Sequence, residues 1–352
     1  MTEKKPMKVL AYFLYGNDRE YLQELEFSVL SAMRFLQNQD DIVIRLICDS
    51  DDVAVQIERL VFSPEEFASW THDRTYFFRG KIGALLKAID HYQCPVILLD
   101  TDTFFTDHPA KLFDRISPVR SLMHQYESTL SESPEPGWKN ILEHNTHGVT
   151  PGSPMYNSGV IGLDPANWTL LKDAFEILDR LYNISPVFNV EQFAVGAALA
   201  QETTISTCPD VIEHYWGAQK DFIRVQIAKA LEHNQAERLL AQIPPFQSIY
   251  PKVRTCDRIF TTLSYFKHWN NNYRRALLSY RSALFYAAKD IGYANAWASN
   301  ALQALKISNH RSYQADFQCF RQDSIETLTW LSPSVKRGWL RFWQQMNSGK
   351  LL

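Results

Sequence analysis

The acidic pair Asp100 and Asp102 is the first place in this sequence where chemistry is expected. The pair directly follows four consecutive apolar residues, 96–99. In an extended chain, side chains two residues apart point the same way, so the two carboxylates share one side while Thr101 turns aside. Two carboxylates this close repel each other unless a proton or a cation lies between them. Oxygen ligands favour Mg²⁺ or Mn²⁺, ions that proteins often share with substrate phosphates. A surface turn with two solvated acids is the alternative interpretation.

A second candidate metal ligand, His214, opens the segment His-Tyr-Trp-Gly-Ala-Gln-Lys at 214–220. A neutral imidazole can complete a carboxylate site and suits manganese. Gly217 permits the backbone to approach a ligand closely, and Lys220 brings a compact positive charge suited to phosphate. A histidine between aromatic residues is also typical of a packed core residue, so the segment gains weight only together with the acidic pair.

The elements that position these residues alternate between strands and helices over the first part of the chain. Four apolar residues between Pro95 and Asp100 predict a central parallel strand that is buried on both faces. Such alternation indicates an α/β protein with a doubly wound sheet, whose ligands gather at the carboxyl ends of the strands. Strands are expected at 8–15, 42–48, 96–99 and 159–163, and helices at 20–36, 53–61, 81–92, 167–181 and from 190 onward.

The second part of the chain differs in both pattern and charge. Helices are expected at 223–240, 273–289 and 294–307, with no strand among them. Residues 1–220 hold 18 Lys and Arg against 31 Asp and Glu, whereas residues 221–352 hold 18 against 8. We therefore expect two domains, an α/β domain at 1–220 and a basic helical region at 221–352. Residues 114–153, rich in Ser, Pro, Glu and His, are expected to form a long and functional excursion.

Composition excludes several classes of protein. With 352 residues, 45% of them hydrophobic, and a net charge of −3, the chain is expected to fold around a real core. An acidic first half argues against nucleic acid as a partner. No apolar run approaches the ~20 residues needed to span a bilayer. Five widely spaced cysteines form neither a disulfide framework nor a zinc pattern, and the start of the chain does not read as a signal peptide. A cytoplasmic location is expected.

Five motifs occur in order along residues 7–220: Gly16-Asn17-Asp18, Asp100-x-Asp102, Asn157-Ser158-Gly159-Val160, Glu191-Gln192 and H-x-x-G-x-x-K at 214–220. Together they resemble glycosyltransferase family 8. The members of this family are retaining enzymes of the GT-A fold, a Rossmann-like mixed sheet flanked by helices, and they use nucleotide sugars. The sequence departs from the family pattern after Lys220, where Asp221 and Phe222 replace Pro and Trp, and at 191–192, where Glu-Gln replaces Asp-Gln.

The resemblance implies a role for each of these residues. Asp100, Asp102 and His214 would hold Mn²⁺ or Mg²⁺, with Asp100 also near the nucleotide ribose. The ion would bind the diphosphate of the donor, which we expect to be a uridine diphosphate hexose. Further donor-binding residues would be Thr101 beside the acidic pair, Gly217 and Lys220 at the phosphates, Gly16, Asn17 and Asp18 at the base and ribose, and Asn157 and Ser158 at the sugar.

Some of these positions have a purely structural alternative. Gly16 to Asp18 also reads as a turn in which Asn17 or Asp18 caps the next helix, and residues 157–159 as a turn before a strand. Arg79 and Lys81 are further candidates for the donor phosphates, or else solvated charges at a helix start.

The resemblance also implies that Glu191 and Gln192 lie near the anomeric carbon of the donor, where a nucleophile or a group that stabilises an oxocarbenium ion would act. Asn189 followed by Gln192 also reads as a capping box that opens a helix.

These observations predict a metal-dependent glycosyltransferase that moves a hexose to an acceptor hydroxyl with retention. The direct route and the double displacement through Glu191 both stay open. A haloacid-dehalogenase-like phosphatase is an alternative, because its nucleophile strand also ends in Asp-x-Asp-x-Thr, here with Thr103 moved next to Asp102. A nucleotide-sugar-binding protein without activity is the non-enzymatic alternative.

The last helix suggests a location. Its apolar residues Val335, Trp339, Phe342 and Trp343 fall on one side, and Lys336, Arg337 and Arg341 fall largely on the other. A basic helix with tryptophans can lie on an anionic membrane surface. That placement, at the inner face of the membrane, would suit a lipid-linked or lipopolysaccharide-type acceptor, while a glycan acceptor stays open. The alternative is that this face packs onto the rest of the protein.

Overall fold

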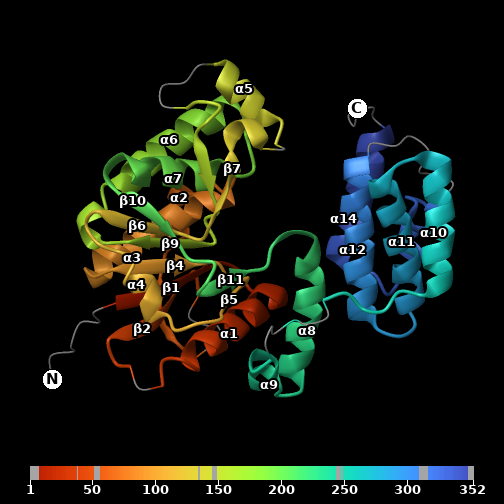
Figure 1. Cartoon of the computed structure of the whole chain (residues 1–352), viewed down its shortest axis with the longest axis horizontal. Coiled ribbons are helices and arrows are strands. Elements are labelled where there is room, and N and C mark those ends of the chain that lie inside the picture. The colour runs from red at the N-terminus through yellow and green to blue at the C-terminus, as the bar shows by residue number, and fades with distance from the viewer. Residues whose placement is uncertain are drawn as a thin grey trace. The chain divides into compact units, whose positions relative to one another are not determined.

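The computed structural model describes residues 8–37, 39–50, 56–133, 135–144, 149–242, 246, 249–308 and 316–347. The chain divides into two compact units, Met1–Tyr215 and Trp216–Leu352 (Figure 1). The first unit contains all the strands of the described residues, and the second is helical.

A mixed sheet of seven strands forms the centre of the first unit, in the order β10-β6-β9-β4-β1-β2-β3. Strand β9 runs antiparallel to both of its neighbours, and the other pairs are parallel. Strands β4 and β9 are buried along their whole length, as expected for strands covered on both faces. The strands are β1 (Lys8–Leu14), β2 (Ile42–Cys48), β3 (Glu58–Val61), β4 (Val96–Leu99), β6 (Arg120–Met123), β9 (Val160–Leu163) and β10 (Thr204–Thr207).

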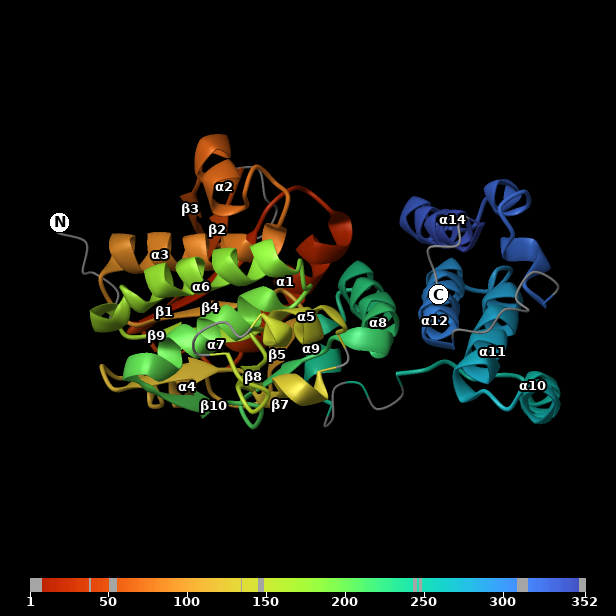
Figure 2. The ribbon, with the colours of Figure 1, turned by 90° about the horizontal axis from the view of Figure 1, so that it is seen from above.

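Helices cover both faces of this sheet, which makes the first unit a three-layer α/β structure. Alternate residues of β1 enter two different cores, Val9 and Ala11 on one face and Leu10 and Tyr12 on the other. The first core contains residues of α3 (Gly80–Tyr92), α6 (Leu170–Ile184) and α7 (Val190–Glu202), and the second contains residues of α1 (Arg19–Met33). Figure 2 shows α3 and α6 lying along the strands. The shorter helices are α2 (Pro64–Trp70), α4 (Ala110–Phe113) and α5 (Gly137–Glu143).

Two short antiparallel ribbons lie outside the main sheet. One joins β5 (Thr103–Phe105) to β11 (Ile212–His214), with Thr103 opposite His214. The other joins β7 (Tyr126–Thr129) to β8 (Pro154–Tyr156), with a bulge between Tyr126 and Ser128. Both ribbons carry residues of the candidate site.

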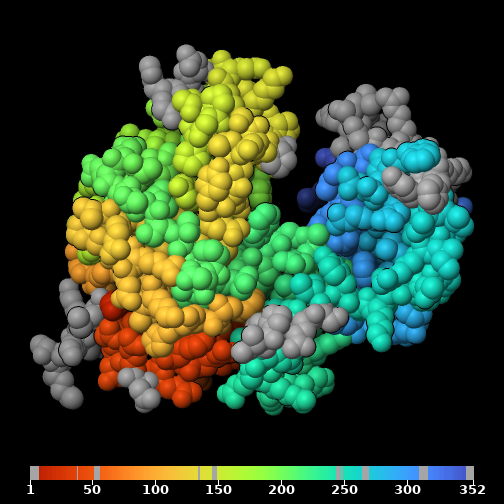
Figure 3. Space-filling view, viewed as in Figure 1, coloured from red at the N-terminus to blue at the C-terminus, as the bar shows by residue number. Residues whose placement is uncertain are grey.

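The predicted α/β architecture is confirmed, but two local predictions are wrong. A helix is expected at 53–61, but residues 58–61 form strand β3, which pairs with β2 at the edge of the main sheet. Residues 53–55 of this prediction lie outside the described part. The expected excursion at 114–153 contributes β6 to the main sheet, together with β7 and α5. Its strands are only four residues long, too short for a clear alternating pattern. The part carrying α5 and β7, yellow in Figure 3, lies at the surface of the first unit.

The described part of the second unit is built from six α-helices around an aromatic core that includes Phe222, Trp297 and Phe320. The helices are α8 (Lys220–Glu232), α9 (Ala236–Leu240), α10 (Thr255–His268), α11 (Asn271–Tyr286), α12 (Ile291–Ser308) and α14 (Pro333–Asn347). Among the described residues, no helix combines the length and the apolar character that crossing a membrane requires.

The apolar face of α14 is not available to a membrane. Trp339, Phe342 and Trp343 are at most 3% exposed. The indole of Trp339 donates to the carbonyl of Ala298 at 3.1 Å, and that of Trp343 to the carbonyl of Phe320 at 2.6 Å. The expectation of a membrane-facing surface here is therefore wrong, because this face fills the core of the second unit.

We expect the substitution Trp339→Ala to lower the free energy of unfolding of the second unit by about 3–5 kcal/mol, the usual cost of a large cavity in a core. Trp269→Ala is the matched control, since this ring is 73% exposed, and its effect should stay within about 0.5 kcal/mol. Urea unfolding followed by far-ultraviolet circular dichroism measures both. Equal effects of the two substitutions would contradict the buried position of Trp339.

Candidate metal and donor site

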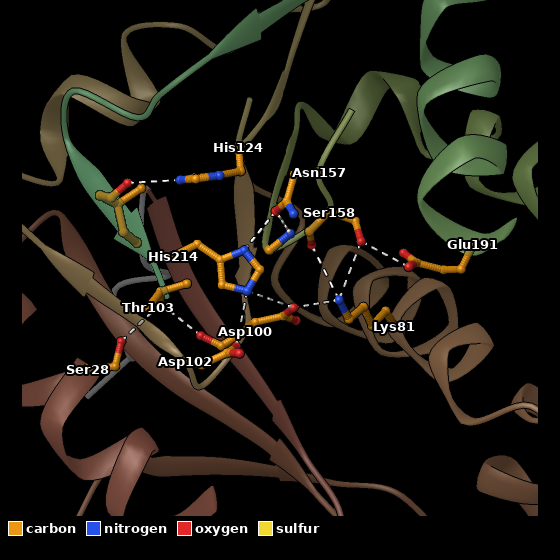
Figure 4. A network of polar contacts seen from close by, with 12 residues as sticks. Ser28, Lys81, Asp100, Asp102, Thr103, His124, Asn157, Ser158, Glu191 and His214 are labelled. Atoms are coloured by element: carbon orange, nitrogen blue, oxygen red, sulfur yellow. Dashed lines mark hydrogen bonds and ion pairs between the residues drawn. The ribbon is translucent and has the colours of Figure 1, made fainter. Parts of the chain in front are cut away.

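The candidate site forms where the buried strand β4 ends. Asp100 follows β4 directly, and its backbone N–H donates to the carbonyl of Gly159 at 2.9 Å. The chain then turns into β5, whose partner β11 ends at His214. The N–H of Tyr215 donates to the carbonyl of Asp102 at 3.1 Å. This ribbon brings the histidine, distant in sequence, against the acidic pair (Figure 4).

The side chains of Asp100, Asp102 and His214 converge as the sequence predicts. One ligand atom from each lies within 4.8 Å of the others. The Nε2 atom of His214 is 3.3 Å from Oδ1 of Asp102 and 3.9 Å from Oδ2 of Asp100. Adjacent ligands of a small octahedral ion, with bonds of about 2.1 Å, lie about 3 Å apart. The separation from Asp102 is close to this value and that from Asp100 is longer, so the two carboxylates and the imidazole could hold a divalent cation after a small movement of Asp100.

The ring of His214 is held in the orientation that a metal ligand needs. Its Nδ1 lies 2.8 Å from Oδ1 of Asn157, an oxygen that also accepts from the N–H of Gly159 at 2.9 Å. An amide oxygen can only accept, so Nδ1 of the imidazole is the donor in this contact, and Nε2 is turned toward the carboxylates. A Cβ at Gly159 would lie 2.3 Å from Nδ1 of His214, so only glycine leaves room for the ring.

A buried lysine neutralises part of the acidic charge. Nζ of Lys81 donates to Oδ2 of Asp100 at 2.7 Å and lies 3.5 Å from both oxygens of Ser158. Burial disfavours the charged ammonium, but the carboxylates of Asp100 and Glu191 outweigh this and hold the pKa of Lys81 above its usual range. The lysine is therefore charged at neutral pH.

Glu191 lies beside this lysine and is only 3% exposed. Its Oε2 accepts from the hydroxyl of Ser158 at 2.9 Å, and its N–H donates to the hydroxyl of Tyr76 at 3.2 Å. Its Oε1 has no hydrogen-bond partner among the described residues. Burial raises the pKa of Glu191 to about 7, with Asp100 adding to the rise and Lys81 and Ser158 opposing it. A carboxyl group with this pKa can give or take a proton near neutral pH.

Gln192 does not form the predicted capping box. The N-terminus of α7 has no side-chain cap: Oδ1 of Asn189 accepts from the indole of Trp138 at 2.9 Å. The amide nitrogen of Gln192 donates instead to Oε2 of Glu127 at 2.8 Å. The capping prediction is wrong because both side chains find partners outside the helix.

Arg79 is engaged elsewhere, so its predicted contact with donor phosphates is not supported. Its Nε and Nη2 donate to the two carboxylate oxygens of Asp179 at 2.8 and 2.9 Å. Its Nη1 donates to the carbonyls of Ser69 and Trp70. The planar guanidinium is thus fixed by a bidentate ion pair and two backbone groups, which is a structural role.

The remaining predicted donor residues fall into two groups. In the first unit, Gly16 has φ +73° and donates to Asp49 at 2.9 Å. Asp18 caps α1 by accepting from the N–H of Glu20 at 2.9 Å, which confirms the capping alternative. Thr101 is buried between the two acids.

Gly217 and Lys220 belong to the second unit, where Gly217 has φ +80° and Lys220 opens α8. Like the base-binding role of Asn17, their contact with phosphates stays a prediction.

Two residues of the site, Glu127 and His124, are not predicted from the sequence. Glu127 accepts from the side-chain amides of both Asn157 and Gln192. The ring of His124 lies edge-on to that of His214, with centroids 5.5 Å apart, and its Nε2 contacts the carbonyl of Ile212 at 3.1 Å. Mainly through burial, the pKa of His124 falls to about 4, so it stays neutral. Both residues come from the segment interpreted as an excursion, where no motif marked them.

Comparison with known proteins gives little for this chain. No protein-family model matches the sequence, and no curated protein matches it either. Among solved structures, the galactosyltransferase LgtC in complex with donor and acceptor sugar analogs is similar, with 14% sequence identity and a TM-score of 0.44. The match covers 65% of this chain and 95% of LgtC. The geometry of the site in this chain therefore carries the functional argument.

We expect Gly159→Ala to weaken Mn²⁺ binding by about 10- to 100-fold, because the new methyl group displaces the ring of His214. Gly196→Ala is the control, since a Cβ there would meet nothing nearer than 3.4 Å. Isothermal titration of each variant with manganese chloride measures the affinity. Wild-type affinity in the Gly159 variant would show that His214 does not bind the ion.

We expect Glu191→Gln to become more stable relative to the wild type as pH rises from about 5 to about 8. The pKa of Glu191 is about 7 in the folded chain against 4.5 for an ordinary glutamate, so the unfolded chain loses this proton first. Wild-type stability therefore falls as pH rises between these values, while glutamine does not titrate. Melting temperatures at both pH values test this. Glu176→Gln, the same substitution at an exposed position, is the control variant for these measurements.

Proposed function

We propose that the chain is a metal-dependent glycosyltransferase that moves a hexose from a uridine diphosphate sugar to an acceptor hydroxyl with retention. One observation carries the proposal: Asp100, Asp102 and His214 converge at the carboxyl end of a buried strand. The charged Lys81 and the buried Glu191 flank this cluster. The ordered motifs that resemble glycosyltransferase family 8 support the same function.

In this proposal the three converging side chains hold Mn²⁺ or Mg²⁺. When bound, the ion offsets the negative charge that grows on the departing diphosphate. Lys81 supplies a further positive charge beside this cluster. Its ammonium group contacts Asp100 and lies 3.5 Å from the hydroxyl of Ser158. Because the lysine is buried, its charge acts in a poorly solvated site, where it stabilises an anion more than it would in water.

The proposed reaction forms a bond between the acceptor oxygen and the anomeric carbon and breaks the bond from that carbon to the diphosphate. The acceptor proton passes to an oxygen of the departing diphosphate or to Glu191, whose pKa of about 7 suits either protonation state. In the direct route the acceptor attacks from the side on which the diphosphate leaves. In the rival route the carboxylate of Glu191 first forms a covalent glycosyl intermediate. Near-normal turnover of Glu191→Gln would eliminate the covalent route.

The phosphatase alternative is less well supported by the geometry. A haloacid-dehalogenase-like site needs a further acidic pair for its magnesium, whereas the group that joins Asp100 and Asp102 is the imidazole of His214.

The acceptor is proposed to be a glycan or a lipid-linked or lipopolysaccharide-type molecule. A cytoplasmic location is part of the same proposal.

We expect a uridine diphosphate hexose to raise the melting temperature of the wild type only when Mn²⁺ is present. A ligand that binds the folded form alone stabilises it by about 2.7 kcal/mol at 100 times its Kd. Asp102→Ala should abolish both this shift and sugar transfer, while Asp90→Ala, at an exposed position, should leave both unchanged. A thermal-shift panel of nucleotide sugars, followed by nuclear magnetic resonance of the product anomer, makes the measurement.

Other outcomes point to the alternatives. Full activity of the wild type in chelator would refute the metal assignment. Release of phosphate from a simple phosphoester without any nucleotide sugar would favour the phosphatase. Donor binding without even slow donor hydrolysis would favour a binding protein without activity.

A further inference from the structure

Glu127 accepts hydrogen bonds from residues on two sides of the candidate site, Asn157 and Gln192. We propose that it is a positioning residue, which fixes His214 for metal binding through Asn157 and fixes the amide of Gln192 on the opposite side. The inference rests on the proposed function, but its central claim concerns the imidazole of His214 and can be tested without a donor sugar.

The first arm runs from Glu127 to the metal ligand. Oε1 of Glu127 accepts from Nδ2 of Asn157 at 2.9 Å, and Oδ1 of the same amide lies 2.8 Å from Nδ1 of His214. A carboxylate only accepts, so it draws the NH₂ end of the amide to itself and leaves the oxygen end for the histidine. The proton of His214 is then fixed on Nδ1. Glu127 thereby acts together with the N–H of Gly159, which donates to the same oxygen of Asn157, to turn Nε2 of His214 toward the ion.

The second arm runs to α7. Oε2 of Glu127 accepts from Nε2 of Gln192 at 2.8 Å. This bond fixes which end of the glutamine amide faces Glu127, so the carbonyl oxygen faces away from it. The neighbouring Glu191 is held separately, by Ser158. One carboxylate therefore orients a metal ligand and the side chain that the motif resemblance places near the anomeric carbon.

The backbone around Glu127 explains how one side chain reaches both partners. Glu127 lies in β7 between Tyr126 and Ser128, where the pairing with β8 shifts register. A bulge leaves the extra residue out of the ladder, bends the strand and re-aims a side chain, and bulges are common next to active sites. Strand β8 ends at Tyr156, directly before Asn157. The bulge thus places Glu127 beside the residue that contacts His214.

The role requires a carboxylate, because two hydrogen bonds must be accepted together. Leucine at this position removes both acceptors. Glutamine keeps one acceptor oxygen and adds a donor nitrogen. Glu127→Gln can therefore still bind Asn157, but it forces the amide of Gln192 to reverse. The two substitutions separate the two arms.

The first experiment measures the affinity of the full-length chain for manganese chloride alone, by isothermal titration. We expect Glu127→Leu to bind Mn²⁺ about 10- to 100-fold more weakly than the wild type. Glu127→Gln and the control Glu176→Leu, at an exposed position, should stay near the wild-type value. Wild-type affinity in a folded Glu127→Leu variant would overturn the inference. Failure of the wild type to bind Mn²⁺ would overturn the proposed metal site and the first arm with it.

The second experiment reads the proton of His214 directly. Nitrogen-15 resonances of the imidazole distinguish the two neutral forms, and His214→Ala identifies the signal. We expect the Nδ1–H form in the wild type and in Glu127→Gln, and a mixture of forms in Glu127→Leu. An unchanged Nδ1–H form in Glu127→Leu would overturn the positioning role whatever the function of the chain proves to be.

The third experiment addresses Gln192. If the proposed transferase activity is present, Glu127→Gln should lower kcat while Mn²⁺ affinity is kept, because only the amide of Gln192 has reversed. Wild-type kcat in this variant would overturn the second arm.

Discussion

The concentration of negative charge at the end of β4 is the constraint on which the rest of the site depends. Asp102 is buried and Asp100 is half-buried, and the two carboxylates are held close together, where like charges repel. The surrounding residues are arranged to compensate this charge. The ammonium of Lys81 contacts one carboxylate, and Nε2 of His214 lies 3.3 Å from Asp102 and 3.9 Å from Asp100. A divalent ion at this place could be bound by all three side chains at once.

Short backbone elements outside the main sheet make this arrangement possible. The β5–β11 ribbon carries His214 to the acidic pair, and the β7–β8 ribbon carries Glu127 to Asn157. Gly159 is the point where they meet, because its missing side chain admits the imidazole and its N–H orients Asn157. The main sheet supplies a rigid edge, and the ribbons supply the residues that one sheet edge alone does not bring together.

Sequence reasoning predicted the parts of the site that carry a local signal. Each of these signals is contained in a few adjacent residues: the buried strand before Asp100, the i, i+2 spacing of the acids and the His214 motif. Glu127 and the ion pair of Arg79 with Asp179 could not be predicted, because each depends on partners distant in sequence. The same holds for β3, whose residues adopt a strand to pair with β2, and for Trp339, whose burial depends on α12. Periodicity shows that a face is apolar, but it does not show what covers that face.

The hydrogen bonds around the site also indicate where a ligand is expected to contribute. Both polar atoms of the Asn157 amide and both oxygens of the Glu127 carboxylate form hydrogen bonds within the protein. The part of the site around these two residues is therefore ordered without a ligand. Oε1 of Glu191 is buried without a partner among the described residues. A buried polar atom without a partner costs about 1–3 kcal/mol, and such atoms in native proteins call for an explanation. In the proposed function, a hydroxyl group of the bound sugar would supply the missing donor. The cost would then be recovered on binding, beside the ion pair of Lys81 and Asp100.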